Sequence, residues 1–214
     1  METFATPARE TADLAFVHAA HDAFRRDVDR LAAVVAAGKD RAPHVRAGWE
    51  NLKEQLHLHF QVEESLLWPR VARAVRGRPV ELAVLADVQE GHARIEPLVV
   101  AVDAALEQDD PSDRANLEAA VAALRTALDV QLRHEDTGAL PLARSVLGPE
   151  EWRGLRDALR RECGTHMTRL VPWIVDGIGP IERSRFLTAL PRAVQEDNRL
   201  TWEPRYRKRR LWSV

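Results

Sequence analysis

Two segments of this chain repeat each other, and each sets ligand-type side chains one helical turn apart. The segment at residues 59–69 aligns without a gap on the segment at residues 131–141. The alignment pairs a histidine with a glutamine, a glutamate with a glutamate and a proline with a proline: His59 with Gln131, Glu63 with Glu135 and Pro69 with Pro141. Side chains four positions apart lie on the same face of a helix. The repeat therefore predicts two helices that present metal ligands to a shared core.

The rest of the chain also has a helical composition. It is rich in alanine, leucine, arginine and glutamate, and it shows no convincing alternation of apolar and polar residues. Breaks at Gly38, at Gly77 with Pro79, and at residues 109–112 separate four predicted helices. These helices span approximately residues 10–37, 43–75, 80–107 and 112–147. Long helices joined by short turns predict an all-α, up-down antiparallel four-helix bundle.

The sequence changes character after Gly148. Pro149 followed by two glutamates is typical of a helix start. Four of the six tryptophans lie beyond residue 150, which is unusual for a disordered tail. We therefore expect a bundle over residues 1–147 and a helical, tryptophan-rich extension over residues 148–214 that packs on it.

Charge and cysteine content narrow the setting in which the protein works. The net charge is −2, and the basic run at residues 205–210 has no second basic stripe beside it, so neither nucleic acid nor a membrane surface is favoured. Cys163 is the only cysteine, which excludes an intrachain disulfide and favours a reducing cytoplasm. The N-terminus lacks signal-peptide features, and no apolar run approaches the roughly 20 residues that span a bilayer. The frequent use of alanine, arginine, valine and leucine is typical of a bacterial protein. The sequence is also compatible with a homo-oligomer.

Each predicted bundle helix carries candidate metal ligands at a comparable depth. In chain order these are His21, His59 with Glu63, His92 with Glu96, and Gln131 with Glu135. Imidazole nitrogens together with carboxylate oxygens suit iron, manganese or zinc. Carboxylates from the second and fourth helices suit a pair of bridged metals. An apolar core would otherwise not tolerate several ionisable groups, because burying an unpaired charge is costly.

Four sequence blocks carry a resemblance to a known family. They are VHAAHDAFRRD around His21, the block from His59 through Glu63 to Pro69, EGHARIEP around His92, and HEDTGALP at residues 134–141. Over roughly residues 10–147 the chain resembles the hemerythrin-like (hemerythrin HHE cation-binding) family. The resemblance implies an up-down four-helix bundle holding a non-heme di-iron centre that binds dioxygen, nitric oxide or peroxide.

The resemblance also implies roles for individual residues. It assigns one iron to His21 and His59, a second iron to His92, Glu96 and the residue at position 131, and the bridges to Glu63 and Glu135.

Two positions depart from the family pattern, and both concern the second iron. The family usually has histidine where this chain has Gln131, and its oxygen carriers have a second histidine where this chain has Glu96. Glutamine can ligate through its amide oxygen, but it binds iron more weakly than imidazole does. His134, one turn from Gln131, could take its place if the helix bulges, and Asp136 could then bridge.

Three classes of function stay open at this point. The first is a di-iron protein that binds a small oxidising ligand for sensing, scavenging or redox chemistry. The second is an enzyme, a di-iron oxidase or oxygenase whose organic substrate lies in a pocket closed by residues 148–214. A more oxygen-rich site, with Glu96 and Gln131 in place of imidazoles, would favour it. The third is a degenerate, metal-poor interaction module.

Overall fold

The computed structural model describes residues 7–108 and 114–213. Throughout these ranges the chain is helical, with short turns and no strand. The expected start of the fourth helix near residue 112 lies outside the described residues. Within the same ranges, no helix is both long enough and apolar enough to cross a membrane.

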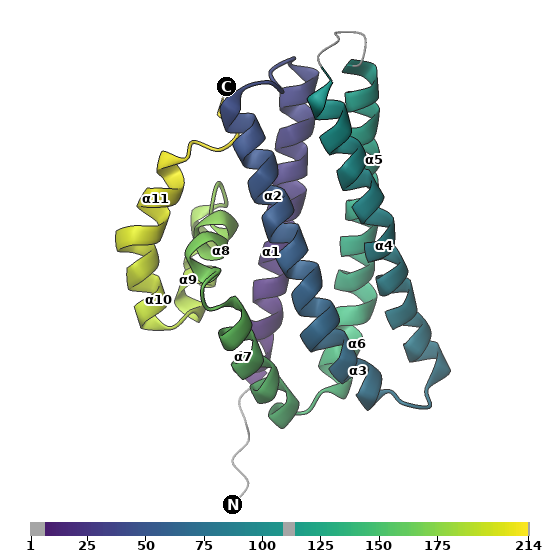
Figure 1. The fold of residues 1–214 in the computed structure, drawn as a ribbon. Coiled ribbons are helices and arrows are strands. Elements are labelled where there is room, and N and C mark those ends of the chain that lie inside the picture. The colour runs from purple at the N-terminus through teal and green to yellow at the C-terminus, as the bar shows by residue number, and fades with distance from the viewer. Residues whose placement is uncertain (1–6, 109–113, 214) are drawn as a thin grey trace, which may run out of the picture.

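Four long helical rods run up and down beside one another (Figure 1). The first and third rods are unbroken: α1 (Pro7–Ala36) and α4 (Pro79–Glu107). The second and fourth rods each consist of two α-helices joined by a π-helical turn: α2 (Pro43–Val62), η1 (Glu63–Leu67) and α3 (Trp68–Ala74), then α5 (Arg114–His134), η3 (Glu135–Ala139) and α6 (Leu140–Val146). The described bounds lie within a few residues of the predicted ones, and the all-α bundle is confirmed.

Glycines and prolines set the ends of the rods. Gly38 and Gly77 have φ angles of 69° and 81°, in the left-handed region that costs glycine no Cβ clash. The helices α1 and α3 end shortly before these two glycines. Pro43 and Pro79 stand in the first turns of α2 and α4, where the missing N–H removes no intrahelical bond. The short turns between these signals make consecutive rods antiparallel.

The apolar core of the bundle is divided into two clusters, one toward each end. Phe24 and Leu128 belong to the first cluster, and Val88 and Leu140 belong to the second. The clusters change over at a similar level on the second, third and fourth rods, between Leu58 and Leu67, between Val88 and Ile95, and between Leu132 and Ala139. His59, Glu63, His92 and Glu135 fall within those intervals, so they form a polar layer between two apolar clusters.

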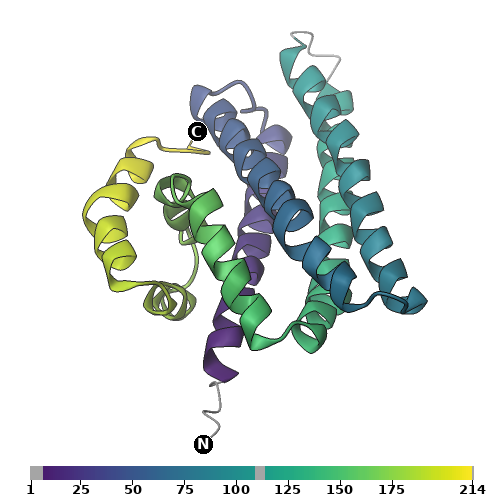
Figure 2. The same ribbon diagram turned by 60° about the horizontal axis from the view of Figure 1, so that its bottom comes forward.

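The remaining described helices cover one side of the bundle, beside α1 and α2 (Figures 1 and 2). They are α7 (Pro149–Cys163), α8 (Met167–Ile174), α9 (Pro180–Ala189), α10 (Arg192–Asp197), the π-helical turn η4 (Asn198–Trp202) and α11 (Glu203–Lys208).

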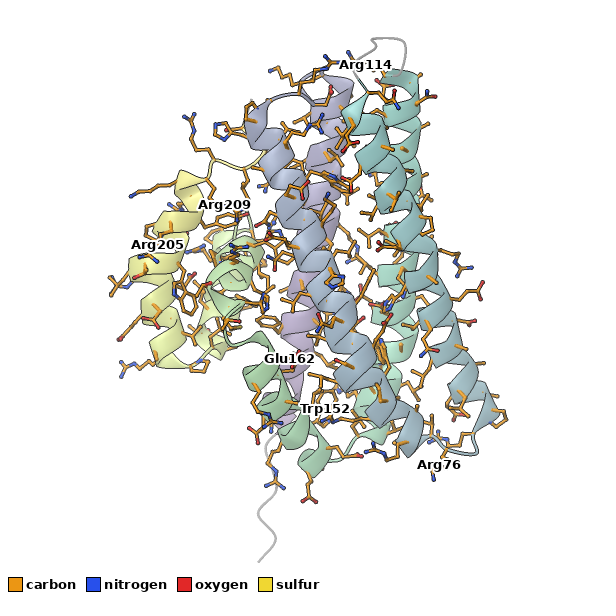
Figure 3. The ribbon with its side chains drawn as sticks, viewed as in Figure 1. Arg76, Arg114, Trp152, Glu162, Arg205 and Arg209 are labelled. Carbon is orange, nitrogen blue, oxygen red and sulfur yellow. The ribbon has the colours of Figure 1, made fainter. Side chains whose placement is uncertain are left out.

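Tryptophans hold this extension against the bundle. Trp173 of α8 is fully buried, and its ring centroid lies 4.9 Å from that of Phe24 in α1. Trp152 of α7, near the foot of the bundle in Figure 3, is buried in the second apolar cluster. The extension and the bundle therefore share both parts of one core.

The end of the chain returns to the start of α2. The backbone N–H of Trp212 donates to the carbonyl of His44 at 2.9 Å. Its indole ring covers Gly48, where a Cβ would lie only 2.5 Å from the ring. Arg209, labelled in Figure 3, donates to the side-chain oxygen of Asn51 at 2.7 Å. These contacts fix the final segment on the surface of α2.

Candidate metal centre

The repeated segments fold as widened turns that begin at the two shared glutamates. In each turn a backbone N–H donates to the carbonyl five residues earlier, from Trp68 to Glu63 and from Leu140 to Glu135. A proline follows directly in both segments, and proline has no N–H to continue a regular α-helical ladder. Such turns insert one extra residue into a helix and are frequent at functional sites. The repeat thus places two glutamates at matched points in the bundle interior.

Two histidines and the two glutamates form the first half of the site, which we call position A. His21 Nε2 lies 3.2 Å from His59 Nε2 and 3.2 Å from Glu135 Oε2. His59 Nε2 lies 3.5 Å from Glu63 Oε1. One ligand atom from each of these four side chains falls within 4.8 Å of all the others. Two imidazoles and two carboxylates gathered in this way could hold one cation.

His92 faces the same two carboxylates from the other side and forms the second half, which we call position B. Its Nε2 lies 3.4 Å from Glu63 Oε2 and 3.0 Å from Glu135 Oε1. Each glutamate therefore turns one oxygen toward position A and its other oxygen toward position B. Carboxylates shared in this manner are the bridges of dinuclear sites in helical bundles.

The glutamate oxygens fit a role as cation ligands. Both oxygens of Glu63 and the Oε2 of Glu135 are buried and accept no hydrogen bond of good geometry within the described chain. A buried carboxylate without partners is costly, and native structures rarely leave one unsatisfied. A bound cation would supply the missing partner for all three oxygens.

Two further acids orient the histidines from outside. Glu64 Oε1 accepts from His92 Nδ1 at 3.0 Å, and Asp136 Oδ1 accepts from His21 Nδ1 at 2.7 Å. Each acid directly follows one of the shared glutamates. In both acidic pairs, the first residue faces the two metal positions and the second accepts a hydrogen bond from a histidine. A carboxylate on one ring nitrogen fixes the tautomer and aims the other nitrogen at the metal.

Asp136 also ties the site to the protein surface. Its Oδ2 accepts from Arg25 at 2.8 Å, and its Oδ1 lies 2.8 Å from Nδ1 of the half-exposed His18. His18, His21 and Asp136 lie close enough to hold a cation by themselves. Arg25 already neutralises the carboxylate, which favours a role in orienting His21 over a role as a separate site.

The charges in the site favour protonated histidines when no metal is bound. Burial lowers the pKa of His21, but the hydrogen bond to Asp136 and the nearby Glu135 more than offset this and raise that pKa to about 9. Burial likewise opposes the charge on His92, and the carboxylates of Glu135 and Glu63 raise its pKa to about 10. For Glu135, burial raises the pKa, yet the three histidines bring it well below its usual range. A metal would have to displace these protons.

Three of the residues expected at the site are placed in ways that spacing alone does not show. Gln131 is buried beside it, and its amide nitrogen donates to Glu135 Oε1 and to the carbonyl of Val88. Glu96 is exposed, because the buried stripe of α4 passes through His92 and Ile95 instead. His134 is half-buried, with its Nε2 3.4 Å from the carbonyl of Val84.

The bulge anticipated in the fourth rod is present, but it leaves His134 outside the site. The π-helical turn begins at Glu135, so the extra residue lies after His134 and does not rotate its side chain inward. Asp136, the expected alternative bridge, instead holds His21.

Sequence reasoning missed Glu64 and Phe60. The ring of Phe60 stacks on His92, with centroids 4.0 Å apart. The acidic pairs of the repeat, Glu63-Glu64 and Glu135-Asp136, were the available signal for Glu64. Nothing in the spacing of Phe60 distinguishes it from an ordinary core aromatic.

A surface pocket lies beside the site. It is lined by Leu14, His18, Asp136, Leu140 and Arg144, among others, and all of its lining comes from α1, η3 and α6. The pocket reaches Asp136, the carboxylate that accepts a hydrogen bond from His21 Nδ1. Its walls belong to the bundle and include no residue of the extension.

The fold and the site together define a helical bundle with a buried cluster of histidines and glutamates suited to cations. Residues 12–143 match the family described as Hemerythrin HHE cation binding domain. The match covers more than half of the chain, and the chain belongs to this family. No curated protein and no solved structure matches it.

Proposed function

We propose that this chain is a non-heme di-iron protein that binds a small oxidising ligand: dioxygen, nitric oxide or peroxide. Its role would be sensing, scavenging or redox chemistry. The observation that carries the proposal is the pair of shared carboxylates. Glu63 and Glu135 each turn one oxygen to position A and the other to position B. That arrangement has a purpose when two cations lie side by side.

The residues of the chain would hold and shape the centre. His21 and His59 would complete position A, and His92 would complete position B. Bound iron would supply redox electrons and a coordination position for the ligand. The apolar clusters above and below the polar layer would keep bulk water away, since hydrophobic surroundings control solvent access to a metal.

Iron is the metal we propose among those that imidazole and carboxylate suit, on the strength of the family resemblance. Manganese and zinc accept the same donors. A reducing cytoplasm, consistent with the single cysteine, would favour loading with ferrous iron.

Ligand binding by the iron-loaded protein tests the proposal. Metal-free protein is loaded with Fe²⁺ without oxygen, and nitric oxide or dioxygen is then added while the absorption spectrum is followed. We expect new absorption bands that saturate with ligand. His57→Ala is the control variant and should respond as the wild type does, because His57 is exposed on the same helix as His59. A loaded protein whose spectrum does not respond to nitric oxide, dioxygen or peroxide would contradict the proposal.

A di-iron oxidase or oxygenase is the second candidate. The donor set favours it, since the four oxygens of Glu63 and Glu135 outnumber the three imidazoles that face them. Against it, the pocket beside Asp136 is walled by the bundle, so it does not support a substrate pocket closed by the extension. Oxygen consumption that depends on an added organic compound would favour this candidate.

A metal-poor interaction module is the third candidate, and Gln131 is the residue that suggests it. Protein made with abundant iron and found to contain none would favour this class.

A further inference from the structure

We propose that Gln131 makes the two metal positions unequal, so that position A holds its cation tightly and position B holds a cation that exchanges. This inference rests on the proposed dinuclear function. It assigns to Gln131 the role of hydrogen-bond donor to a bridging carboxylate, in place of the ligand role expected for the residue at this point.

The orientation of the Gln131 amide is fixed by its neighbours. Its Nε2 lies 3.2 Å from the backbone carbonyl of Val88 and also contacts Glu135 Oε1. A carbonyl and a carboxylate oxygen can only accept, so the NH₂ end must face both of them. Turning the amide over would bring three acceptor oxygens together. The amide oxygen is therefore directed away from the carboxylate that a cation at position B would share.

Gly91 provides the space for that oxygen. A Cβ built on Gly91 would lie 1.5 Å from Gln131 Oε1, a separation that no side chain could occupy. The glutamine side chain is thus packed against the backbone of α4 next to His92 and is buried. Its nitrogen is bonded to both acceptors and its oxygen lies against Gly91, so the amide oxygen is not directed at position B.

The donor sets of the two positions then differ in number and kind. Position A has two imidazoles, from His21 and His59, and one oxygen from each glutamate. Position B has the imidazole of His92 and the remaining two oxygens. Imidazole is the stronger neutral ligand for iron, so position A is favoured.

Gln131 weakens position B in a second way. Its N–H group donates to Glu135 Oε1, which is the same oxygen that faces His92 Nε2. A hydrogen bond to this oxygen withdraws charge from the atom a cation at position B would need. At position A, Glu135 Oε2 accepts no hydrogen bond of good geometry among the described residues. The two oxygens of one carboxylate therefore differ in basicity in the same sense as the two ligand sets.

Titration of metal-free protein with Fe²⁺, without oxygen, tests the inference. Calorimetry and competition with a chelator would give the affinity of each equivalent. We expect one tight equivalent and a second that binds about tenfold or more weakly, which is the size of effect that a lost ligand or supporting contact produces. The wild-type protein alone provides this readout, so the test does not depend on a variant that folds.

Gln131→His supplies the comparison. It should tighten the second equivalent by about 10- to 100-fold and leave the first unchanged. Gln55→His is the matched control, because Gln55 is also a buried glutamine but lies roughly two helical turns before Glu63, between Leu52 and Leu56 of the first apolar cluster. The control should keep the two unequal equivalents of the wild type.

The outcomes separate this inference from the proposed function. Two equivalents of equal affinity in the wild type would overturn the inference and support a dinuclear centre. One equivalent in the wild type that becomes two in Gln131→His would overturn the wild-type dinuclear function and support the role of Gln131. No binding in either protein would overturn both.

Discussion

In the acidic pairs Glu63-Glu64 and Glu135-Asp136, neighbouring residues have different roles at this site. In each pair the first carboxylate points between the histidines, and the second accepts a hydrogen bond from the far nitrogen of one histidine. Neighbouring residues on a helix point about 100° apart, so one pair can reach both the interior and the outer side of a ligand. The repeat of this arrangement gives each position one externally oriented histidine.

Removing an orienting acid should weaken metal binding without removing a ligand. We expect Asp136→Asn and Glu64→Gln each to lower the affinity for Fe²⁺ by about 10- to 100-fold, because the histidine behind each loses its fixed tautomer. Chelator competition measures the change. Glu90→Gln is the control, since Glu90 is exposed and pairs with Arg94 on the same helix. Unchanged affinity in both variants would show that the acids do not orient the ligands.

The raised pKa values of His21 and His92 predict how stability changes with pH in the metal-free protein. Both histidines are charged more readily when folded than when unfolded, where the value is about 6.5. Their contribution to stability is therefore fully present below pH 6.5 and is lost as the pH rises toward about 9 and 10. At acidic pH, the depressed pKa of Glu135 predicts a loss of stability once the pH falls below the ordinary pKa of a glutamate, because the carboxylate must then be protonated on unfolding.

Denaturant unfolding between pH 6 and pH 10 checks this prediction. The free energy of unfolding should fall across that range in metal-free protein. Metal-loaded protein should lose less, because the metal has already replaced the protons. His92→Gln should reduce the slope in the metal-free state. A slope that is flat, or that rises with pH, would contradict the assigned charges.

At the scale of the element, the widened turns have a common sequence signature. Three described π-helical turns begin six residues before a proline: Glu63 before Pro69, Glu135 before Pro141 and Asn198 before Pro204. A proline ring clashes with the carbonyl four residues earlier in a regular helix, and a wider turn moves that carbonyl away. In the two turns at the site, Ser65 and Thr137 also donate their hydroxyls to carbonyls four residues back.

Replacing the proline should therefore let the regular helix compete. We expect Pro141→Ala to weaken metal binding, because Glu135 would rotate away from its shared position. The same change should stabilise the metal-free protein, by less than the roughly 3 kcal/mol that separates proline from alanine in a helix interior. Affinity and thermal unfolding measure the two effects. Pro149→Ala, at the start of α7, is the control, and equal metal affinity in both variants would contradict this role for Pro141.

Much of this architecture could be predicted from the sequence, because the spacing of apolar residues determines which face each helix buries. Helix bounds followed from apolar stripes and from glycine and proline breaks. His59, Glu63, His92 and Glu135 were predicted from four-residue spacing and His21 from its family-like sequence block, and the structure brings these side chains together.

Spacing could not settle the positions where packing decides. Glu96 has the spacing of a ligand, but it stands beside the buried stripe of α4 and is exposed. The amide of Gln131 is set by the carbonyl of Val88 and the gap at Gly91, which are on another helix. The π-helical turn starts one residue too late to turn His134 inward. Each of these outcomes depends on tertiary contacts that a local pattern does not contain.

At the scale of the whole molecule, we propose that residues 148–214 fold as one unit with the bundle. Trp173 lies in the same apolar cluster as Phe24, and the ring of Phe24 in turn lies 5.2 Å from that of His59. The indole N–H of Trp173 donates at 2.8 Å to Asp27, a fully buried residue of α1. Arg30 pairs with Asp27 as well. The extension thus packs against Phe24, whose ring lies beside the candidate ligand His59.

Loss of Trp173 should therefore affect both stability and the site. We expect Trp173→Ala to lower the free energy of unfolding by about 3–5 kcal/mol, since it leaves a large cavity and removes the indole donor to the buried Oδ2 of Asp27. Trp202→Ala, at a half-buried position, should cost less. Denaturant unfolding followed by both circular dichroism and tryptophan fluorescence measures this. Two separate transitions in the wild type would contradict a single folding unit.

The central claim is a dinuclear centre held by residues of four rods, and metal content per chain tests it most directly. Protein dialysed to equilibrium against a saturating concentration of Fe²⁺ without oxygen should bind about two irons per chain above the free concentration, so that the exchanging cation of position B is counted as well. His59→Ala and Glu63→Ala should lose most of this iron, whereas His57→Ala should keep it. Full iron content in either His59→Ala or Glu63→Ala would contradict the account.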